Sequence, residues 1–241
     1  MSYYFNMNKK IDTVVILAGG KGTRMREETE FIPKPMVKIG DKPLLMHLID
    51  YFASFKNFNF VICTGYKEEI IFDYFAKHTV RNVKILSTGL ETNTGGRIAQ
   101  VKNLINSDFI MTYGDGLSDI KINNLIDFHL SHSKTATISV TKPFSRFGLV
   151  NFDSDGVVYE FIEKPKLNSY INMGYMVLNQ NIFSYINENE IFEQRPLKRL
   201  ADDSDICAFK HEGFFKPLDT YREYLEFKKM WDTGKAPWKV E

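Results

Sequence analysis

The stretch Leu17-Ala-Gly-Gly-Lys-Gly-Thr-Arg24 begins at the end of the apolar run Val14-Val-Ile-Leu17. It is followed further along by Pro33-Lys34. A short, wholly apolar run predicts a buried parallel strand. The three glycines after it allow the backbone to turn sharply and to approach a ligand closely. Arg24 and Lys34 place two positive charges beside the exposed backbone N–H groups. This order of strand, glycine turn and cations predicts a site for a polyanion, most simply a nucleoside triphosphate.

Two familiar phosphate-binding loops do not match this stretch. A P-loop requires Gly-x-x-x-x-Gly-Lys-Ser/Thr, and no Lys-Ser/Thr pair opens a helix here. The dinucleotide fingerprint Gly-x-Gly-x-x-Gly is met by Gly20 and Gly22, but bulky Met25 stands at the third glycine. A side chain there would block close packing of helix on strand. An oxidoreductase is therefore not expected, and the remaining alternative is a plain glycine-rich turn with solvated charges.

Composition limits the classes of partner. The 241 residues carry 31 Lys and Arg against 30 Asp and Glu, a net charge of +1, which argues against binding nucleic acid or a membrane surface through bulk charge. No apolar run is long enough to span a bilayer, and the polar first ten residues lack an apolar signal core. The only cysteines, Cys63 and Cys207, are expected as small core residues in a reduced, cytoplasmic setting, although sequence does not exclude a disulfide.

Apolar periodicity predicts alternating strands and helices in the first half. The expected strands lie at 14–17, 60–63, 83–86 and 109–113, and the helices at 44–55, 70–75, 94–104 and 123–132. This alternation predicts a doubly wound, mainly parallel sheet, in which ligands bind at the carboxyl ends of strands. The second half is richer in strands, at 135–140, 171–178 and 206–209, with a hairpin around Asp153-Ser-Asp-Gly156 and a last helix at 220–231. We expect one domain over residues 1–241, with 1–120 mainly nucleotide-binding and 121–241 mainly acceptor-binding.

Two carboxylates are candidate metal ligands. Asp115 follows the expected strand 109–113, and Asp219 precedes the last helix. Mg²⁺ prefers oxygen ligands and is commonly held by one or two carboxylates plus substrate phosphates, so the pair could converge on one ion. The alternatives are an ordinary Asp-Gly turn at Asp115 and a capping box formed by Thr220 with Glu223.

Further polar residues have two interpretations each. Thr94-Gly-Gly-Arg97 predicts a helix N-terminus suited to anions, or an ordinary glycine-rich helix start. Lys164 could hold a phosphate and Glu163 a hydroxyl, but an adjacent Glu and Lys are usually a solvated pair. His129 and His132 share a helix face without a third ligand nearby, so helix-surface or capping positions are expected rather than a zinc site.

The opening stretch and the Pro33-Lys-Pro35 that follows resemble the signature of the sugar-nucleotide pyrophosphorylases. Over nearly the whole chain the motifs are similar to those of one family among them, the glucose-1-phosphate cytidylyltransferases. The further matching segments are Thr94-Gly-Gly-Arg97, Tyr113-Gly-Asp-Gly116, Phe128-His129 with His132, Arg146-Phe-Gly148, Glu163-Lys-Pro165, Ile171-Asn172-x-Gly174, Pro196-Leu197, Gly213-Phe214, Asp219-Thr220 and Gly234-Lys-Ala-Pro-Trp-Lys239. The last of these is the most specific to the cytidylyl group.

The resemblance implies a Rossmann-like nucleotidyltransferase fold, with a mixed, mainly parallel central sheet and a strand-rich acceptor-binding second half. It also implies roles for single residues. The residues implied to bind the nucleotide are Leu17, Ala18, Gly19, Gly20, Lys21, Gly22, Thr23, Arg24, Lys34, Thr92, Arg97 and Gly114. Asp115 and Asp219 are implied to bind the metal, and both of them, with Arg24 and Lys34, to take part in catalysis. The residues implied to bind the acceptor are Arg146, Glu163, Lys164, Asn172 and Gly174. This chain departs from the family in its short polar link before Thr92 and in Lys21, where an apolar residue is common.

The activity implied is Mg²⁺-dependent transfer of a cytidylyl group from CTP to a sugar 1-phosphate, best glucose 1-phosphate, with a role in capsule or O-antigen polysaccharide biosynthesis. Two alternatives remain: cytidylyl transfer to another phosphorylated small molecule, such as another sugar phosphate or a phosphorylated amino acid, and a non-catalytic nucleotide-sensing domain. The expected partners are the two small-molecule substrates, without nucleic acid or membrane, and a homo-oligomer is left open.

Overall fold

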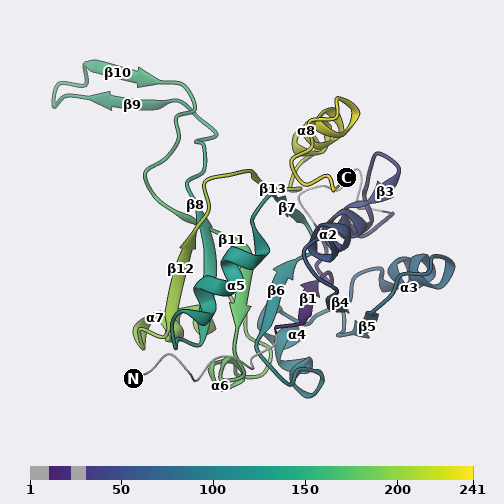
Figure 1. Cartoon of the computed structure of the whole chain (residues 1–241). Helices are drawn as coiled ribbons and strands as arrows, with labels where there is room; N and C mark the ends of the chain where they lie inside the picture. The colour runs from purple at the N-terminus through teal and green to yellow at the C-terminus, as the bar shows by residue number, and fades with distance from the viewer. Residues whose placement is uncertain (1–10, 23–30, 241) are drawn as a thin grey trace.

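The computed structural model describes residues 11–22 and 31–240, and its centre is a seven-stranded sheet in the order β12-β8-β11-β6-β1-β4-β5 (Figure 1). The strands are β1 (Thr13–Leu17), β4 (Asn59–Thr64), β5 (Val83–Ser87), β6 (Phe109–Tyr113), β8 (Ala136–Thr141), β11 (Ile171–Leu178) and β12 (Ile206–Lys210). β11 runs antiparallel to β6 and β8, whereas the other neighbouring pairs are parallel. The expected mixed, mainly parallel sheet is confirmed.

Helices pack on both faces of this sheet, and β1 explains why. Val14 and Ile16 belong to one hydrophobic core together with residues of α2, whereas Val15 and Leu17 belong to a second core together with residues of α4. A strand covered on both faces has no solvent side, so every position of its run is apolar. The helices are α2 (Leu44–Ala53), α3 (Glu68–Lys77), α4 (Thr94–Gln100), α5 (Ile122–Leu130), α6 (Ile182–Tyr185), α7 (Arg195–Asp202) and α8 (Tyr221–Asp232), with single 3₁₀ turns η2 (Lys34–Met36) and η3 (Lys102–Leu104).

β1 and β6 end together at one edge of the sheet. Leu17 is in register with Tyr113, and the N–H of Gly114 donates to the Leu17 carbonyl at 2.9 Å. On the other side of β1, the N–H of Ala18 donates to the carbonyl of Cys63 at 2.8 Å. The glycine turn and Asp115 therefore leave the sheet at the same edge, as expected for parallel strands.

A short ladder that sequence patterning did not predict brings the chain's late segment to this edge. β7 (Gly116–Ser118) pairs antiparallel with β13 (Phe215–Pro217), and Pro217 lies opposite Gly116. The N–H of Leu218 donates to the carbonyl of Asp115 at 2.7 Å. The residues that follow Pro217 are thereby held beside the residues that follow β6. A second small ladder joins β2 (Lys38–Ile39) to β3 (Lys42–Pro43).

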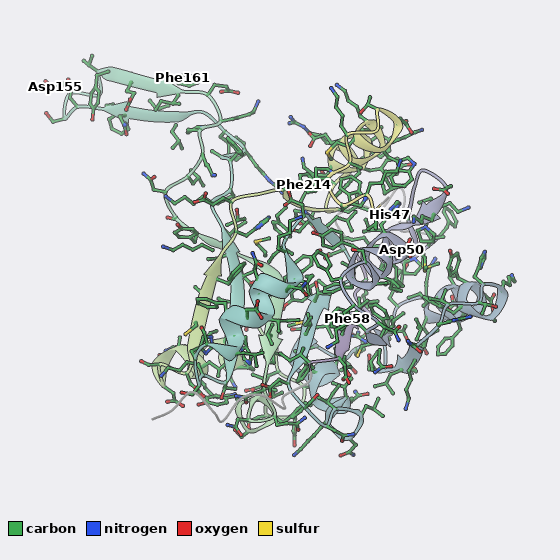
Figure 2. All side chains as sticks on the ribbon, viewed as in Figure 1. His47, Asp50, Phe58, Asp155, Phe161 and Phe214 are labelled. Atoms are coloured by element: carbon green, nitrogen blue, oxygen red, sulfur yellow. The ribbon has the colours of Figure 1, made fainter. Side chains whose placement is uncertain are left out.

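The expected hairpin forms an arm, defined as residues 142–170, that projects from the body (Figure 1). Its strands are β9 (Leu149–Phe152) and β10 (Val158–Ile162), and every residue of both strands is exposed. Figure 2 shows Phe161 and Asp155 on the arm, far from the body's core residue Phe58. Apolar residues on a strand normally lie against a core, and exposed apolar patches commonly mark interaction surfaces.

Three expectations were wrong in detail. The helix expected over 94–104 is α4 followed by the 3₁₀ turn η3. His129 does not lie on a helix surface; it is 2% exposed, and its Nδ1 lies 2.9 Å from the hydroxyl of Thr137, which explains a histidine on an otherwise apolar face. Cys207 is half-buried rather than a core residue, whereas Cys63 is buried, and both thiols are free.

No helix within residues 11–22 and 31–240 is long and apolar enough to cross a membrane.

Candidate active site

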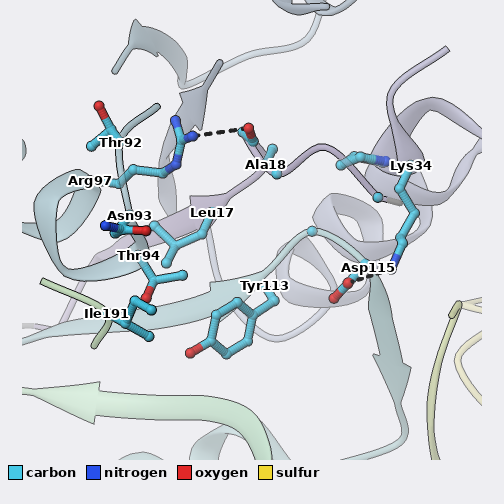
Figure 3. A pocket seen from close by; sticks show the side chains of 15 residues that line it. Leu17, Ala18, Lys34, Thr92, Asn93, Thr94, Arg97, Tyr113, Asp115 and Ile191 are labelled. Atoms are coloured by element: carbon cyan, nitrogen blue, oxygen red, sulfur yellow. Dashed lines mark hydrogen bonds and ion pairs between the residues drawn. The ribbon is translucent and has the colours of Figure 1, made fainter. Parts of the chain in front are cut away.

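The glycine turn opens into a cavity of about 390 Å³, within the size range of small-molecule sites. Figure 3 looks into it, with Lys34 and Asp115 at one end and Thr92, Asn93 and Arg97 at the other. Ten of the expected nucleotide or metal residues line it: Leu17, Ala18, Gly19, Gly20, Gly22, Lys34, Thr92, Arg97, Gly114 and Asp115. Thr23 and Arg24 lie outside the residues that the structure describes. Lys21 does not line the cavity, and its ammonium pairs with exposed Glu91 at 2.7 Å.

At one end of the cavity the lining residues Lys34 and Asp115 meet a second carboxylate, Asp219, which is not itself a lining residue. The Nζ of Lys34 lies 3.0 Å from Oδ2 of Asp115 and 2.8 Å from Oδ1 of Asp219. The Lys34 side chain is 8% exposed. Burial opposes its charge, but Asp115 and Asp219 outweigh burial and raise the pKa of Lys34 above its ordinary value of 10.5. The ammonium is therefore charged at neutral pH, and the two carboxylates expected to meet do meet.

The donor set at this end suits a hard divalent cation. Two carboxylate oxygens from different strand ends point at one position, and the cavity beside them can take further oxygen ligands from a substrate. Mg²⁺ is commonly held by one or two carboxylates together with substrate phosphates. In the part of the chain that the structure describes, no three His, Cys, Asp or Glu side chains gather as an all-protein metal cage. The residues present therefore fit Mg²⁺ bound together with a nucleotide.

Arg97 has a different setting from the one expected. It is 3% exposed, and its guanidinium donates to the carbonyls of Thr64 at 2.7 Å and Gly19 at 2.9 Å and to the hydroxyl of Thr88. These acceptors belong to the end of β4, to the glycine turn and to the segment after β5. Arg97 thus lines the cavity while its hydrogen-bonding groups hold the glycine turn to the sheet.

A wall of the cavity that sequence reasoning missed comes from residues 187–193. Asn93 donates through its side chain to the carbonyl of Asn189 at 2.8 Å, and the N–H of Gly95 donates to the carbonyl of Glu190 at 2.9 Å. Ile191 of this segment faces the cavity. The contacts join positions almost a hundred residues apart, and no spacing rule in sequence reports them.

Tyr113 was also missed as a cavity residue. Its hydroxyl donates to Glu193, which also accepts from the Thr94 hydroxyl at 2.7 Å. Burial, together with the Glu193 carboxylate, raises the pKa of Tyr113 well above its ordinary value, so the phenol remains a donor. Its ring lies over Gly174, where an added Cβ would approach to 2.3 Å. Gly174 has φ +77°, so both its conformation and this contact favour glycine.

The residues expected on the acceptor side do not line this cavity. Glu163 and Lys164 form an exposed pair at 2.8 Å, as the solvated-pair alternative predicts. Asn172 accepts from the N–H of Gly174 at 2.8 Å, and Arg146 lies 3.3 Å from Glu223 of α8. The five residues expected to bind the acceptor therefore lie on the arm and on β11, and none of them lines the described cavity.

The segment 234–239, expected to be the most specific for the cytidylyl group, packs elsewhere. Trp238 is 1% exposed and contacts Phe227, Phe214 and His47 of α2. It is a core residue under α8. It does not line the cavity.

Comparison with known proteins gives consistent matches. The model of the family described as "Nucleotidyl transferase" matches residues 13–212. The glucose-1-phosphate cytidylyltransferase of Salmonella typhi is 40% identical over 94% of this chain and 98% of its own length. The probable glucose-1-phosphate cytidylyltransferase of Bacillus subtilis is 37% identical over the same shares. Among solved structures, HddC from Yersinia pseudotuberculosis superposes with a TM-score of 0.75 at 27% identity, covering 92% of this chain and 100% of that one. That protein has also been solved in complex with GMP-PN.

Proposed function

The chain belongs to the nucleotidyl transferase family, and on that basis we propose that it transfers the cytidylyl group of CTP to glucose 1-phosphate, releasing pyrophosphate. The observation that carries the proposal is Lys34 held between Asp115 and Asp219 at one end of the cavity. Relatives that cover almost the same length and carry this name support the choice of substrates. The product would be a CDP-sugar, which supports the expected role in capsule or O-antigen polysaccharide biosynthesis.

The reaction is a substitution at phosphorus. A phosphate oxygen of the acceptor forms a bond to the α-phosphorus of CTP, and the bond from that phosphorus to the bridging oxygen breaks, so that pyrophosphate leaves. The second pKa of a phosphate monoester is near ~6, so the nucleophile is already ionised at neutral pH. A dedicated general base is not required, and the obstacle is repulsion between two anions.

The chain's residues would lower this repulsion and align the reactants. We propose that the triphosphate lies toward Lys34, with Asp115 and Asp219 holding Mg²⁺, which would neutralise phosphate charge. Lys34 would move from the carboxylates to the phosphates and donate to them. Backbone N–H groups of the glycine turn, with Arg24, would bind the remaining oxygens, and Thr92 would contact the nucleoside. Fixing two reactants in line can supply roughly 7–11 kcal/mol of the barrier.

The division of labour follows the two halves of the chain. We propose that residues up to about 120 bind mainly the nucleotide, because they supply the glycine turn, Lys34 and most of the cavity lining. The later half would bind mainly the acceptor, through Arg146, Glu163, Lys164, Asn172 and Gly174. We propose the cytoplasm as the compartment. The two free thiols are consistent with it, because the cytosol keeps thiols reduced.

The exposed arm supports self-association, with a second copy of the chain as the proposed partner. Register places Val150 opposite Phe161 and Phe152 opposite Val158, an uncharged face that an identical face can cover. Phe147, Phe152, Tyr159 and Phe161 are 63–76% exposed. Fully covered rings bury about 150–250 Å² each, so these four offer roughly 500 Å². The arm's aliphatic side chains bring this toward the ~800 Å² per partner of a stable interface.

Light scattering after gel filtration tests the arm. The wild-type chain is expected as an oligomer and the double variant Phe152→Ser, Phe161→Ser as a smaller species with unchanged circular dichroism. A wild-type monomer at tens of micromolar would overturn this part of the proposal.

A pyrophosphate-release screen tests the activity. The design crosses four NTPs with glucose 1-phosphate, other sugar phosphates and phosphorylated amino acids, each with and without Mg²⁺. The proposal predicts turnover with CTP and glucose 1-phosphate that Asp115→Asn lowers at least ~100-fold without unfolding the chain. Turnover with CTP and only another acceptor would replace the acceptor. Nucleotide binding without pyrophosphate release from any pair would favour a sensing domain.

A further inference from the structure

The start of α8 carries a carboxylate that none of the roles above uses. Thr220 and Glu223 form the capping box expected from sequence: the Thr220 hydroxyl accepts from the N–H of Glu223, and the Glu223 side chain accepts from the N–H of Thr220 at 2.8 Å. Such a box fixes where a helix begins.

Glu223 makes a further contact that the capping box does not require. The same oxygen, Oε2, accepts from the backbone N–H of Asp219 at 2.8 Å. Its other oxygen, Oε1, faces the guanidinium of Arg146 at 3.3 Å. The Glu223 side chain is 16% exposed, so water competes only weakly for these bonds.

The backbone around Asp219 is therefore held on both sides. The N–H of Leu218 is bound to the carbonyl of Asp115, and the N–H of Asp219 is bound to Glu223. With its backbone fixed, the Asp219 side chain has only its own two torsions left to adjust, and it meets Lys34 at 2.8 Å. Bonds from N–H groups to a charged carboxylate are shorter and about twice as strong as neutral ones.

We propose that Glu223 is a positioning residue, whose carboxylate fixes Asp219 for the divalent cation that the proposed function requires. Groups that orient metal ligands typically change metal affinity by 10–100-fold when they are removed. The proposal predicts that loss of the Glu223 carboxylate weakens cation binding by at least about tenfold. Glu223 does not line the cavity, and the contact through which it would act on the metal is its bond to the N–H of Asp219.

The chain contains a matched control for the stability of α8. Thr220→Ala removes the other half of the capping box and leaves the Glu223 carboxylate on the N–H of Asp219. Thr220→Ala should lower Tm by roughly 2–6 °C because it removes one cap contact, and Glu223→Ala should lower it by at least as much because it also leaves the N–H of Asp219 without this acceptor. A purely structural role for Glu223 predicts that the two variants behave alike toward metal.

The test measures Mn²⁺ binding by electron paramagnetic resonance, with a non-hydrolysable CTP analogue present, in wild type, Glu223→Ala, Glu223→Gln and Thr220→Ala. We expect wild-type affinity in Thr220→Ala, a loss of about tenfold or more in Glu223→Ala, and partial rescue in Glu223→Gln, whose amide oxygen can accept the same N–H groups. Equal affinities in Thr220→Ala and Glu223→Ala would overturn the proposal. If Mn²⁺ binding follows this ranking but glucose 1-phosphate is not turned over, only the proposed acceptor is contradicted. If the wild-type chain does not bind Mn²⁺, both the role of Glu223 and the proposed function are overturned.

Discussion

The ammonium of Lys34 and the carboxylate of Asp219 lie 2.8 Å apart in a buried contact between residues 185 positions apart in the chain. Asp115 joins the same ammonium from the end of β6. A buried ammonium is costly unless it is paired, and here two carboxylates share it. The lysine thus occupies the position between the oxygens that a divalent cation would need.

Competition between Lys34 and metal leads to a prediction for Lys34→Met. Turnover should fall by at least ~100-fold, because one donor to the developing charge is lost. Mn²⁺ affinity of the nucleotide-free chain should instead rise, because the two carboxylates are no longer neutralised. Exposed Lys38→Met is the control and should change neither. Turnover near wild type, or weaker Mn²⁺ binding, would contradict this account of Lys34.

Arg97→Lys tests whether Arg97 acts through the glycine turn. A lysine cannot span the carbonyls of Gly19 and Thr64 as the guanidinium does, and each buried acceptor left unpaired costs about 1–3 kcal/mol. We expect Tm to fall by several degrees and KM for CTP to rise about tenfold, or ~1.4 kcal/mol, with a smaller change in kcat. Steady-state kinetics distinguish the roles: a collapse of kcat at unchanged KM would mean that Arg97 contacts the reacting phosphates.

Gly174→Ala tests the contact with Tyr113, with Gly156→Ala as its matched control. Both glycines have positive φ, +77° and +82°, but only at Gly174 would a Cβ meet another group. Left-handed strain costs about 1–2 kcal/mol at either position, and overpacking adds about 1–3 kcal/mol at Gly174. Urea unfolding should therefore show the larger loss for Gly174→Ala, accompanied by a raised KM for CTP. Equal losses in the two variants would show that the Tyr113 ring moves aside freely.

Glu190 gives the cavity wall a pH dependence. Hydrogen bonds from Arg199, ahead of all other contributions, lower the pKa of Glu190 from 4.5 to about 2. A carboxylate with a lowered folded pKa contributes stability above its ordinary pKa, and that contribution is lost as pH falls from about 4.5 toward 2. Glu190→Gln should thus be less stable than wild type at pH 7, and the difference should vanish near pH 2. Urea unfolding at several pH values measures the difference in stability between wild type and Glu190→Gln, with Glu188→Gln at an exposed position as control. A stability difference that is unchanged at pH 2 would show that it comes from packing and not from the charge of Glu190.

Sequence alone predicted the parts of this molecule that rest on local rules. The apolar run before Leu17 required a strand buried on both faces, and Thr220 with Glu223 formed the capping box. Asp115 and Asp219 were paired because Mg²⁺ is commonly held by one or two carboxylates, one of which followed a central strand. What held them together was the ladder between β7 and β13, which is too short to leave a periodic signal.

Polar contacts across long separations could not be predicted in the same way. Arg97 looked like an anion ligand because its spacing from a helix start suited one, yet its acceptors are two backbone carbonyls, of Thr64 and Gly19, and the hydroxyl of Thr88. The wall around Ile191 and the bond from Tyr113 to Glu193 depend on where β11 and its following loop return to the sheet. His129 was expected at a helix surface or cap because no third metal ligand was apparent nearby; its hydroxyl partner, Thr137, belongs to another element and could not be paired with it from sequence.

The most direct test of the central claim is product identification. The purified chain is incubated with CTP, glucose 1-phosphate and Mg²⁺, and the products are measured by mass spectrometry and phosphorus NMR. The account predicts CDP-glucose and pyrophosphate in equal amounts, with neither formed when CTP, glucose 1-phosphate or Mg²⁺ is omitted. A folded chain that forms no CDP-glucose from this mixture would contradict it.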